Sequence, residues 1–376
     1  MFKTLFNCIH TNNLLSSVKT LGSHVEQLKT YTRSRWQRTK KMRRTWERVS
    51  GAGDRKEYTL LSYNILAQDL LVEHLHLYID IEPPMLRWDH RLLRLTEEIQ
   101  YIKPDILCLQ EMQFNHLKGF VRRISFKREL EYVFKKKTGC RTDGCAIIYD
   151  KSKFRLLAEH PVEYYTRGHA VLNRDNIALL AKFADKKQPK KKFVIATTHL
   201  LYNPKRQDVR IAQVQSLLEA IHEFSVETEG GKDRPLPVIL TGDFNFESKT
   251  RPYQVLSEPF KSDSVSEKPV GGDSARIYSK QEANREYYLR AAGGEESVNN
   301  LQMAPIDFGN QSASTFQQNW ITVDYVLHSV DQHRNKIQVQ SVYALPKIND
   351  CIQHGQIPNK FLGSDHYSLA IKFSVL

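Results

Sequence analysis

Amide, carboxylate and imidazole side chains recur where apolar, strand-like segments of this chain end or begin. In layered α/β proteins, ligands gather where strands end and loops begin, so such residues can converge on one site from distant parts of a sequence. A single residue of this kind would mean little, but the recurrence predicts a site. The residues are Asn64, Glu111, His199, Asp243, Asn245, Asp324, Asp365 and His366.

The GDFN segment places Asp243 and Asn245 two residues apart after the apolar run PVILT. On an extended backbone, both side chains point to the same side. A carboxylate is a hard oxygen ligand suited to Mg²⁺, and an uncharged amide can hold a phosphoryl oxygen without adding negative charge. The alternative is a turn at Gly242-Asp243, with Asn245 capping the next element.

Glu111 ends the apolar run LCLQ. Taken alone it is an exposed acid at a strand edge. Magnesium, however, keeps several waters and typically takes only one or two carboxylates besides phosphate oxygens. Glu111 together with the GDFN group would therefore suffice for a Mg²⁺ site.

Asp324 lies inside an apolar segment, and Asp365-His366 opens the last strand. A buried aspartate needs a partner, and an aspartate bonded to one imidazole nitrogen orients a histidine that acts at a reacting phosphate. We therefore expect Asp324 to pair with His366, although such a pair can also be purely structural. His199 ends a β-branched strand, and we expect it to contact the phosphate.

Positive and amide side chains near these strands predict contacts with a nucleic-acid backbone. For those at the start of the helix after His199, a solvated helix face is an equally good interpretation. The expected substrate-binding residues are Arg174, Asn176, Asn203 and Arg206, with Lys205 and Arg210 nearby. The basic-aromatic segment 131–137, EYVFKKK, favours a polyanion that also stacks, or is a solvated strand edge.

Short runs rich in β-branched residues alternate with amphipathic stretches from about Tyr58 onward, which is typical of a mixed α/β protein. Helices are expected at 87–101 and 208–224, where apolar residues share one face. Several strands are apolar on both faces, which indicates sheets covered by helices in a layered sandwich. Strands are expected at 59–64, 105–111, 144–150, 176–183, 192–200, 237–245, 323–330, 337–345 and 366–373.

The segment 257–320 interrupts this rhythm with polar, Gly/Ser/Glu/Gln-rich sequence, and we expect a flexible surface insertion that could also shape a substrate lip. The expected domains are a basic N-terminal extension, 1–57, and a catalytic domain, 58–376. No internal repeat is visible in the sequence, which does not exclude a pseudo-symmetric pair of sheets.

Positive charge is concentrated at the N-terminus. Residues 1–50 hold eleven lysines and arginines and two acids, a balance of +9 that leaves +4 of the net +13 to the rest of the 376 residues. Such a segment can be a mitochondrial transit peptide, an arm that touches nucleic-acid phosphates, or a solvated tail. We expect a cytoplasmic protein. If the N-terminal segment is a transit peptide, the protein would instead be mitochondrial.

Composition excludes several classes of protein. Five cysteines with no paired spacing and no secretory signal argue against a disulfide framework, and Cys140 and Cys145 are better packing residues than zinc ligands. No apolar run approaches the roughly 20 residues of a membrane span. We expect a monomer without a membrane span.

The ordered set SYNIL, LCLQE, DGCAIIYD, NRDNIAL, TTHL, GDFN, TVDYVL and SDHYSLAIKF resembles the exonuclease/endonuclease/phosphatase superfamily over nearly all of residues 58–376. Details such as YNILAQDLL and LRWDHR are similar to the Angel-type proteins, which are related to nocturnin and to the deadenylase nucleases of the Ccr-Not complex. Two features depart from the deadenylases: no leucine-rich-repeat region precedes residue 58, and the 257–320 segment differs.

The resemblance implies a four-layer α/β sandwich, with two mainly antiparallel sheets packed face to face and helices outside. By matching motif, it implies that Mg²⁺, or Mn²⁺ in its place, is bound by Glu111 with Asp243, Asn245 and Asp365. It also implies that Asn64 and Asn245 assist substrate and metal and that Asp243 positions or activates the attacking water. Asp324 would orient His366, which together with His199 would stabilise the phosphoryl transition state.

The implied reaction is metal-assisted attack of water on phosphorus at an RNA 3′ end, in mRNA or tRNA-processing intermediates. Angel-type resemblance implies hydrolysis of a terminal 2′,3′-cyclic phosphate to a cis-diol. The same residues would serve a 3′-to-5′ exoribonuclease that acts as a poly(A) deadenylase, which is the alternative. A catalytically silent RNA-binding scaffold and a small-molecule or lipid phosphatase are further alternatives.

Overall fold

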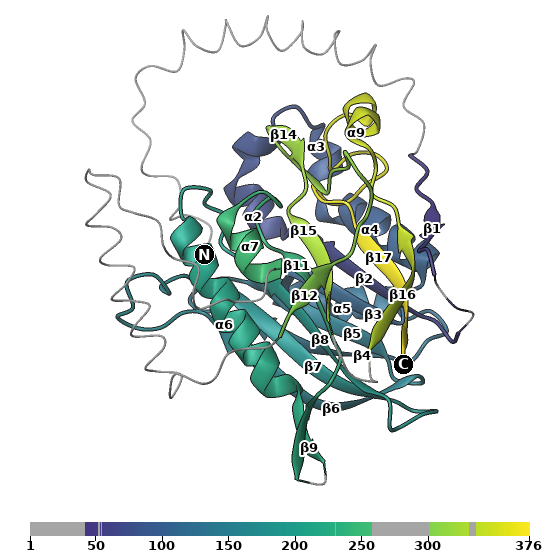
Figure 1. Ribbon diagram of the computed structural model, residues 1–376. Coiled ribbons are helices and arrows are strands. Elements are labelled where there is room, and N and C mark those ends of the chain that lie inside the picture. The colour runs from purple at the N-terminus through teal and green to yellow at the C-terminus, as the bar shows by residue number, and fades with distance from the viewer. Residues whose placement is uncertain (1–41, 52, 54, 230, 258–300, 331–335) are drawn as a thin grey trace, which may run out of the picture. The chain divides into compact units, whose positions relative to one another are not determined.

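Two β-sheets lie face to face in the computed structural model (Figure 1). It describes residues 42–51, 53, 55–229, 231–257, 301–330 and 336–376. Residues Arg44–Leu376 form one compact unit, which contains both sheets.

The first sheet has seven strands, and each strand is antiparallel to its neighbours except for the parallel pair β2 and β3. In spatial order the strands are β1 (Trp46–Arg48), β16 (Ile337–Tyr343), β17 (Leu369–Val375), β2 (Tyr58–Asn64), β3 (Ile106–Gln113), β5 (Asp143–Asp150) and β4 (Leu130–Lys136).

The second sheet has six strands, and its one parallel pair is β8 and β11. Their spatial order is β12 (Met303–Pro305), β15 (Asp324–Ser329), β11 (Val238–Asp243), β8 (Lys192–His199), β7 (Ile177–Asp185) and β6 (Phe154–Glu163). Two short ribbons pair β9 (Val226–Glu229) with β10 (Lys232–Pro235), and β13 (Thr315–Gln317) with β14 (Asn319–Ile321).

Helices cover the outer faces of both sheets. Helices α4 (Trp88–Ile102) and α5 (Phe114–Ile124) pack on the first sheet, and α6 (Gln207–Ser225) and α7 (Arg251–Ser257) pack on the second. Shorter elements are α2 (Gln68–Glu73), the 3₁₀ helix η2 (Leu75–Tyr78), α3 (Pro83–Leu86) and α9 (Ile348–His354). The expected four-layer α/β sandwich is therefore confirmed.

Aromatic side chains fill the space between the sheets. Phe154, Phe183 and Phe193 of the second sheet are fully buried, and Phe193 meets Phe373 of the first sheet with ring centroids 6.0 Å apart. Edge and tilted contacts of this kind add to the stabilisation from burying apolar surface. The strand ends that carry the polar residues are thus held by a rigid core on both sides.

Each of the nine strands expected from the sequence is present, and so are both expected helices, as α4 and α6. The sequence did not reveal β6, because its burial pattern is mostly exposed and it contains Pro161, which edge strands tolerate. It also did not reveal α5, which starts directly after β3 at Gln113 with no side-chain cap.

Parts of the expected insertion and extension are folded. In the 257–320 segment, residues 258–300 lie outside the described residues, whereas β12 pairs with β15. In the 1–57 segment, residues 1–41 lie outside them, whereas β1 pairs with β16 and Arg44 donates to the Tyr343 and Ser368 carbonyl oxygens.

The described residues contain no helix that is long and apolar enough to cross a membrane. Cys108, Cys140, Cys145 and Cys351 are free thiols, and only Cys140 is exposed. Cys8 lies outside the described residues.

Candidate active site

Asn64 connects the two sheets at the end where the expected site residues meet. Its Nδ2 donates to Glu111 Oε1 at 3.0 Å and to Asp243 Oδ2 at 2.9 Å. Its Oδ1 accepts the Leu66 backbone N–H at 3.0 Å. Because every polar atom of this buried amide is engaged, its orientation is set and it holds two carboxylates from different sheets beside each other.

Glu111 reaches the site through a β-bulge. The register between β3 and β5 shifts between Leu109 and Met112, and Glu111 has a left-handed φ of 58°. Bulges re-aim side chains and are frequent next to active sites. Glu111 Oε2 accepts the Ala67 backbone N–H at 2.8 Å, which holds the buried carboxylate in place.

The GDFN segment ends strand β11 and turns directly after it. Asp243 is the last residue of β11, and its Oδ1 accepts the Asn245 backbone N–H at 3.0 Å, as in a turn. Asn245 has a φ of 54° rather than an extended conformation, and its Nδ2 donates to the Leu200 carbonyl at 3.0 Å. The extended backbone that would align the two side chains is therefore interrupted at Asn245 by a turn directly after Asp243, and a contact of Asn245 with metal or substrate stays a prediction.

Gly242 lets the two parallel strands of the second sheet approach each other at this point. A Cβ on Gly242 would lie 2.3 Å from the Thr198 carbonyl oxygen, far inside van der Waals contact. Glycine is the residue that permits such backbone approach. Asp243 and His199, which are partners in the β11–β8 register, are thereby brought together.

His366 and Asp324 form the expected pair. His366 Nδ1 lies 2.8 Å from Asp324 Oδ2, and its Nε2 lies 3.7 Å from Asp243 Oδ2. Although burial lowers the pKa of His366, the carboxylates of Asp324 and Asp243 outweigh it and raise that pKa well above its ordinary value. His366 therefore carries a proton at neutral pH, with Nε2–H directed to the site.

His199 is the second imidazole. Its Nε2 lies 3.7 Å from Asp243 Oδ2 and its Nδ1 lies 4.0 Å from Glu111 Oε1. Burial, together with the charges of Lys137 and His366, lowers its pKa well below the ordinary value, so the ring is neutral. Its Nδ1 is buried and has no hydrogen-bond partner among the described residues.

Asp365 lies at the margin of this group. Its Oδ2 accepts the Tyr78 hydroxyl at 2.7 Å, and its Oδ1 lies 4.0 Å from His366 Nε2. Among the described residues, two groups have ligand atoms that all lie within 4.8 Å of one another. One group is Glu111, His199 and Asp243, and the other is Asp243, Asp324 and His366; Asp365 belongs to neither. Its expected role as a metal ligand stays a prediction.

The carboxylates crowd each other. Burial raises the pKa of Glu111, and burial with the charge of Asp324 raises the pKa of Asp243 to about 7. Buried carboxylates that lie this close together are stabilised by a cation. The oxygen atoms of Glu111 and Asp243 therefore fit a divalent metal ion that prefers oxygen ligands.

Sequence reasoning missed a buried ion pair beside Glu111. Lys137 Nζ lies 2.7 Å from Asp143 Oδ2, and both side chains are buried. Two signals were available, namely Asp143 in the DGCAIIYD motif and Lys137 at the end of the 131–137 segment. The pair adds a fixed positive charge near Glu111, since Lys137 lowers the pKa of that carboxyl against the effect of burial.

The four expected substrate-binding residues are all engaged in contacts within the chain. Asn176 is buried and donates to the His199 carbonyl at 3.0 Å, while Arg206 binds Asp208 through two nitrogens. Arg174 donates to Asn173, and Asn203 Oδ1 accepts the Lys205 backbone N–H. Asn176 therefore positions the end of β8, and contacts of the other three with substrate stay predictions.

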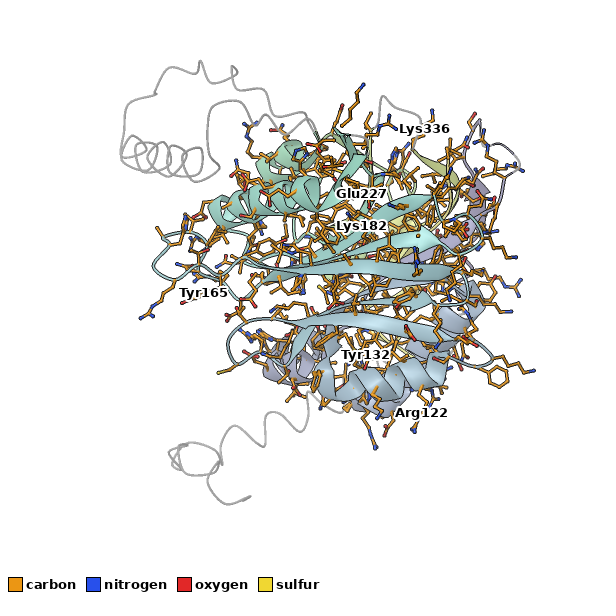
Figure 2. The ribbon with its side chains drawn as sticks, turned by 90° about the horizontal axis from the view of Figure 1, so that it is seen from below. Arg122, Tyr132, Tyr165, Lys182, Glu227 and Lys336 are labelled. Atoms are coloured by element: carbon orange, nitrogen blue, oxygen red, sulfur yellow. The ribbon has the colours of Figure 1, made fainter. Side chains whose placement is uncertain are left out.

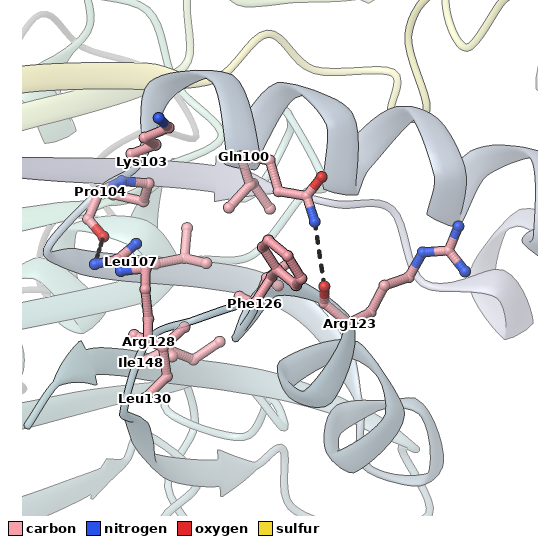
Figure 3. A pocket seen from close by; sticks show the side chains of 11 residues that line it. Gln100, Lys103, Pro104, Leu107, Arg123, Phe126, Arg128, Leu130 and Ile148 are labelled. Atoms are coloured by element: carbon pink, nitrogen blue, oxygen red, sulfur yellow. Dashed lines mark hydrogen bonds between the residues drawn. The ribbon is translucent and has the colours of Figure 1, made fainter.

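A separate pocket of about 350 Å³ lies between α4, α5 and strands β3 to β5 (Figure 3). Leu107 and Ile148 are partners near the start of β3 and line it, together with Lys103 and Arg128. None of its described lining residues is an acid or a histidine. It therefore lacks the groups that hydrolysis of a phosphate ester needs.

This chain is similar to proteins of a known family. A model of the Endonuclease/Exonuclease/phosphatase family matches residues 61–366. Protein angel of Drosophila melanogaster is 46% identical over 327 residues, which is 85% of this chain and 81% of that protein. Protein angel homolog 1 of Homo sapiens is 40% identical over 210 residues, which is 52% of this chain and 30% of that protein.

A solved structure has the same architecture. The crystal structure of ANGEL2, described as a 2′,3′-cyclic phosphatase, in complex with adenosine-2′,3′-vanadate superposes with a TM-score of 0.71. The superposition covers 88% of this chain and 98% of that one, at 25% sequence identity.

Proposed function

Because this chain belongs to the endonuclease/exonuclease/phosphatase family, as an Angel-type phosphoester hydrolase, we propose that it hydrolyses terminal 2′,3′-cyclic phosphate on RNA to a cis-diol. The observation that carries this proposal is the similarity to ANGEL2, a 2′,3′-cyclic phosphatase whose structure holds adenosine-2′,3′-vanadate. The convergence of two imidazoles and two carboxylates around Asn64 supports it.

Mg²⁺ would be held by Glu111 and Asp243, with Asn245 and Asp365 as further expected ligands, and Mn²⁺ would be accepted by the same oxygen ligands. The reaction has two hydrolytic steps, each with one water: the first opens the ring to a phosphomonoester, and the second releases phosphate and leaves the cis-diol. When bound, the ion would neutralise charge on the phosphoryl oxygens and stabilise the leaving ribose oxygen in each step. Asn64 keeps the two carboxylates in place, since it donates to both.

The two histidines have different roles in this proposal. Protonated His366, oriented by Asp324, donates its Nε2–H to a non-bridging phosphoryl oxygen, where negative charge grows in the transition state. Neutral His199 donates an N–H to the phosphate from the other side without adding charge. Asp243 lies between both rings and orients the attacking water.

The substrates would be the 3′ ends of mRNA or of tRNA-processing intermediates, met by a monomeric enzyme in the cytoplasm. Residues 58–376 would form the catalytic domain. Light scattering on the purified chain tests the monomer.

An end-group assay tests the activity. Purified protein with Mg²⁺ is given one RNA ending in 2′,3′-cyclic phosphate and one oligoadenylate with a free 3′-hydroxyl, each beside Glu111→Ala. We expect the first RNA to lose phosphate without shortening and the second to stay intact. Shortening of the oligoadenylate in a ladder would identify an exoribonuclease, and inertness toward both would favour an RNA-binding scaffold.

A further inference from the structure

The catalytic end of the molecule has two rims of opposite character. We define the basic rim as residues 164–175, between β6 and β7, together with residues 200–206, between β8 and α6. Both segments adjoin His199, since Ile177 pairs with His199 in the β7–β8 register and the Asn176 side chain donates to the His199 carbonyl. The basic rim therefore continues directly from the site.

The backbone of the basic rim is held firmly. The buried Tyr164 hydroxyl lies 2.8 Å from Thr198 Oγ1, and the Tyr164 N–H donates to the Asn176 carbonyl. On the second segment, the Leu201 N–H donates to Gln213, and Arg210 donates to carbonyl oxygens of residues 201–204. Side chains that project from such a backbone are pre-organised for binding.

Two tyrosines project from this rim into solvent. Tyr165 is 46% exposed and Tyr202 is 54% exposed, although neighbouring residues such as Tyr164 and Leu200 are buried. Figure 2 shows Tyr165 and Lys336 at opposite ends of the sheets. Lys336 precedes the start of β16, which pairs with the end of β17, so Tyr165 lies at the end that carries His366.

Positive charge accompanies the tyrosines. Arg167 and Lys205 are exposed, and neither forms an ion pair with an acid in the described part of the chain. The acid within the first segment, Asp175, accepts a hydrogen bond from the Thr138 hydroxyl at 2.6 Å. A rigid surface with exposed rings and unneutralised cations fits single-stranded nucleic acid, since bases stack on rings and phosphates bind cations.

A second rim beside the site is unsuited to a polyanion. We define the acidic rim as residues 68–89, which adjoin the site through Tyr78, the partner of Asp365. Its exposed side chains include Val72 and Ile79. Glu73 pairs with Arg141, which leaves four exposed acids against a single arginine of the segment, Arg87; the acids are Asp69, Asp80, Glu82 and Asp89. Phosphates would be repelled along this side.

The segment 131–137, which the sequence offered as a stacking surface, has its lysines engaged. Lys135 pairs with Glu163, Lys136 Nζ donates to three carbonyl oxygens including that of Arg141, and Lys137 pairs with Asp143. Unlike Lys135 and Lys137, Arg167 and Lys205 of the basic rim form no ion pair with a described acid.

We propose that the RNA strand upstream of the reacting end runs along the basic rim, with Tyr165 and Tyr202 stacking on bases and Arg167 and Lys205 binding phosphates. This inference rests on the proposed action at RNA 3′ ends and adds the direction in which the strand leaves the site. It makes the enzyme selective for single-stranded ends over mononucleotides, with little base preference, because every base has a stacking face.

Binding is measured first, in EDTA so that no hydrolysis occurs, by fluorescence anisotropy with a labelled single-stranded RNA of roughly twelve nucleotides that ends in a 3′-phosphate. Tyr165→Ala and Tyr202→Ala should each weaken Kd roughly tenfold. Arg167→Gln and Lys205→Gln should each reduce the salt-dependence slope by about 0.7. The matched control is Tyr101→Ala with Lys103→Gln, an exposed ring and a cation at the far end of α4.

Unchanged Kd in the rim variants, or equal weakening in the matched control, would overturn the proposal. With hydrolysis restored by Mg²⁺, the ratio of kcat/KM for the oligonucleotide to that for adenosine 2′,3′-cyclic phosphate should fall about tenfold in Tyr165→Ala/Tyr202→Ala. A proportionate fall on both substrates would instead mean that the rim shapes the site, against the proposal. If the wild type hydrolyses neither substrate yet binds RNA through the rim, the proposed function fails and the strand path stands.

Discussion

The two halves of the sandwich use the same construction to carry the site. In the first, α4 joins the parallel strands β2 and β3, and in the second, α6 joins the parallel strands β8 and β11. The last paired residues correspond, Asn64 with Gln110 in the first half and His199 with Asp243 in the second. The pseudo-symmetry that the sequence did not reveal is therefore present in the structure.

Each half has a buried arginine on its helix that donates hydrogen bonds to backbone carbonyl oxygens near the site. Arg91 of α4 donates to the carbonyl oxygens of Ile65 and Gly363 and to Gln68, and Arg210 of α6 donates to those of Asn203 and Asn245. Burial lowers the pKa of Arg91 to about 10, which still leaves it charged. Each helix thus holds the loops that carry the reactive side chains.

The halves differ in how they deliver a carboxylate. In the second half, Asp243 occupies the last paired position and faces Asn64 directly. In the first half that position holds Gln110, whose Nε2 bonds Thr197 of the other sheet at 2.8 Å, and the bulge turns the next residue, Glu111, to the same side. The two halves therefore bring a carboxylate to the site in different ways. The second half uses the normal alternation of side chains along a strand, and the first half uses a bulge that interrupts this alternation.

The largest expected effect comes from the two carboxylates. Glu111→Gln and Asp243→Asn should each lower kcat/KM at least roughly a thousandfold, because each removes a charged oxygen ligand of the expected cation. Steady-state hydrolysis of cyclic-phosphate RNA and Mg²⁺ titration measure this. The control Gln110→Glu/Glu111→Gln moves the carboxylate by one residue along β3. It should not recover activity, and recovery would mean that the bulge is not needed to place the carboxylate.

Asp324→Asn should lower kcat about a hundredfold or more, since a neutral amide no longer holds His366 in its protonated form. Asp365→Asn, assayed at saturating Mg²⁺ because Asp365 is also an expected metal ligand, is the matched control. Its effect should be smaller because Asp365 lies 4.0 Å from His366 and is bonded to Tyr78. Single-turnover rates at saturating substrate separate the two. Equal losses would contradict the assignment of Asp324 as the orienting residue.

Replacing the buried arginines tests the parallel between the helices. Arg91→Met should lower the free energy of unfolding by about 3 kcal/mol, because several buried carbonyl oxygens lose their donor. Arg210→Met should cost about 1–2 kcal/mol, since the loop it holds includes exposed residues 202–205 that water can reach. Urea denaturation followed by fluorescence measures both, and the reverse order would break the comparison.

The smallest effect concerns backbone strain. At residues 111 and 245, where φ is 58° and 54°, the glycine variant should be about 1 kcal/mol more stable than the alanine variant. At Arg155 on the exposed edge strand β6, the order should reverse. Thermal melting of the six variants decides this, and the same order at all three positions would remove strain as the explanation.

Apolar patterning determined much of the fold. Continuous β-branched runs identified the strands buried on both faces, since only a doubly covered strand is apolar on both sides. The exposed edge strand β6 and the uncapped helix α5 lacked that signal. Motif order was enough to collect Asn64, Glu111, Asp324 and His366, because strand ends carry their side chains to a common edge.

By itself, then, the sequence determined which residue types reach the site and which layers hold them, because burial and strand propensity are local properties of the chain. Only the tertiary structure decided the bulge at Glu111, the turn at Asn245, the engaged lysines of 131–137 and the burial of Arg91. Each depends on partners that are distant in sequence: Gln110 bonds Thr197, and Arg91 bonds Gly363. Such partners become neighbours only when the chain folds, so a local sequence pattern does not predict them.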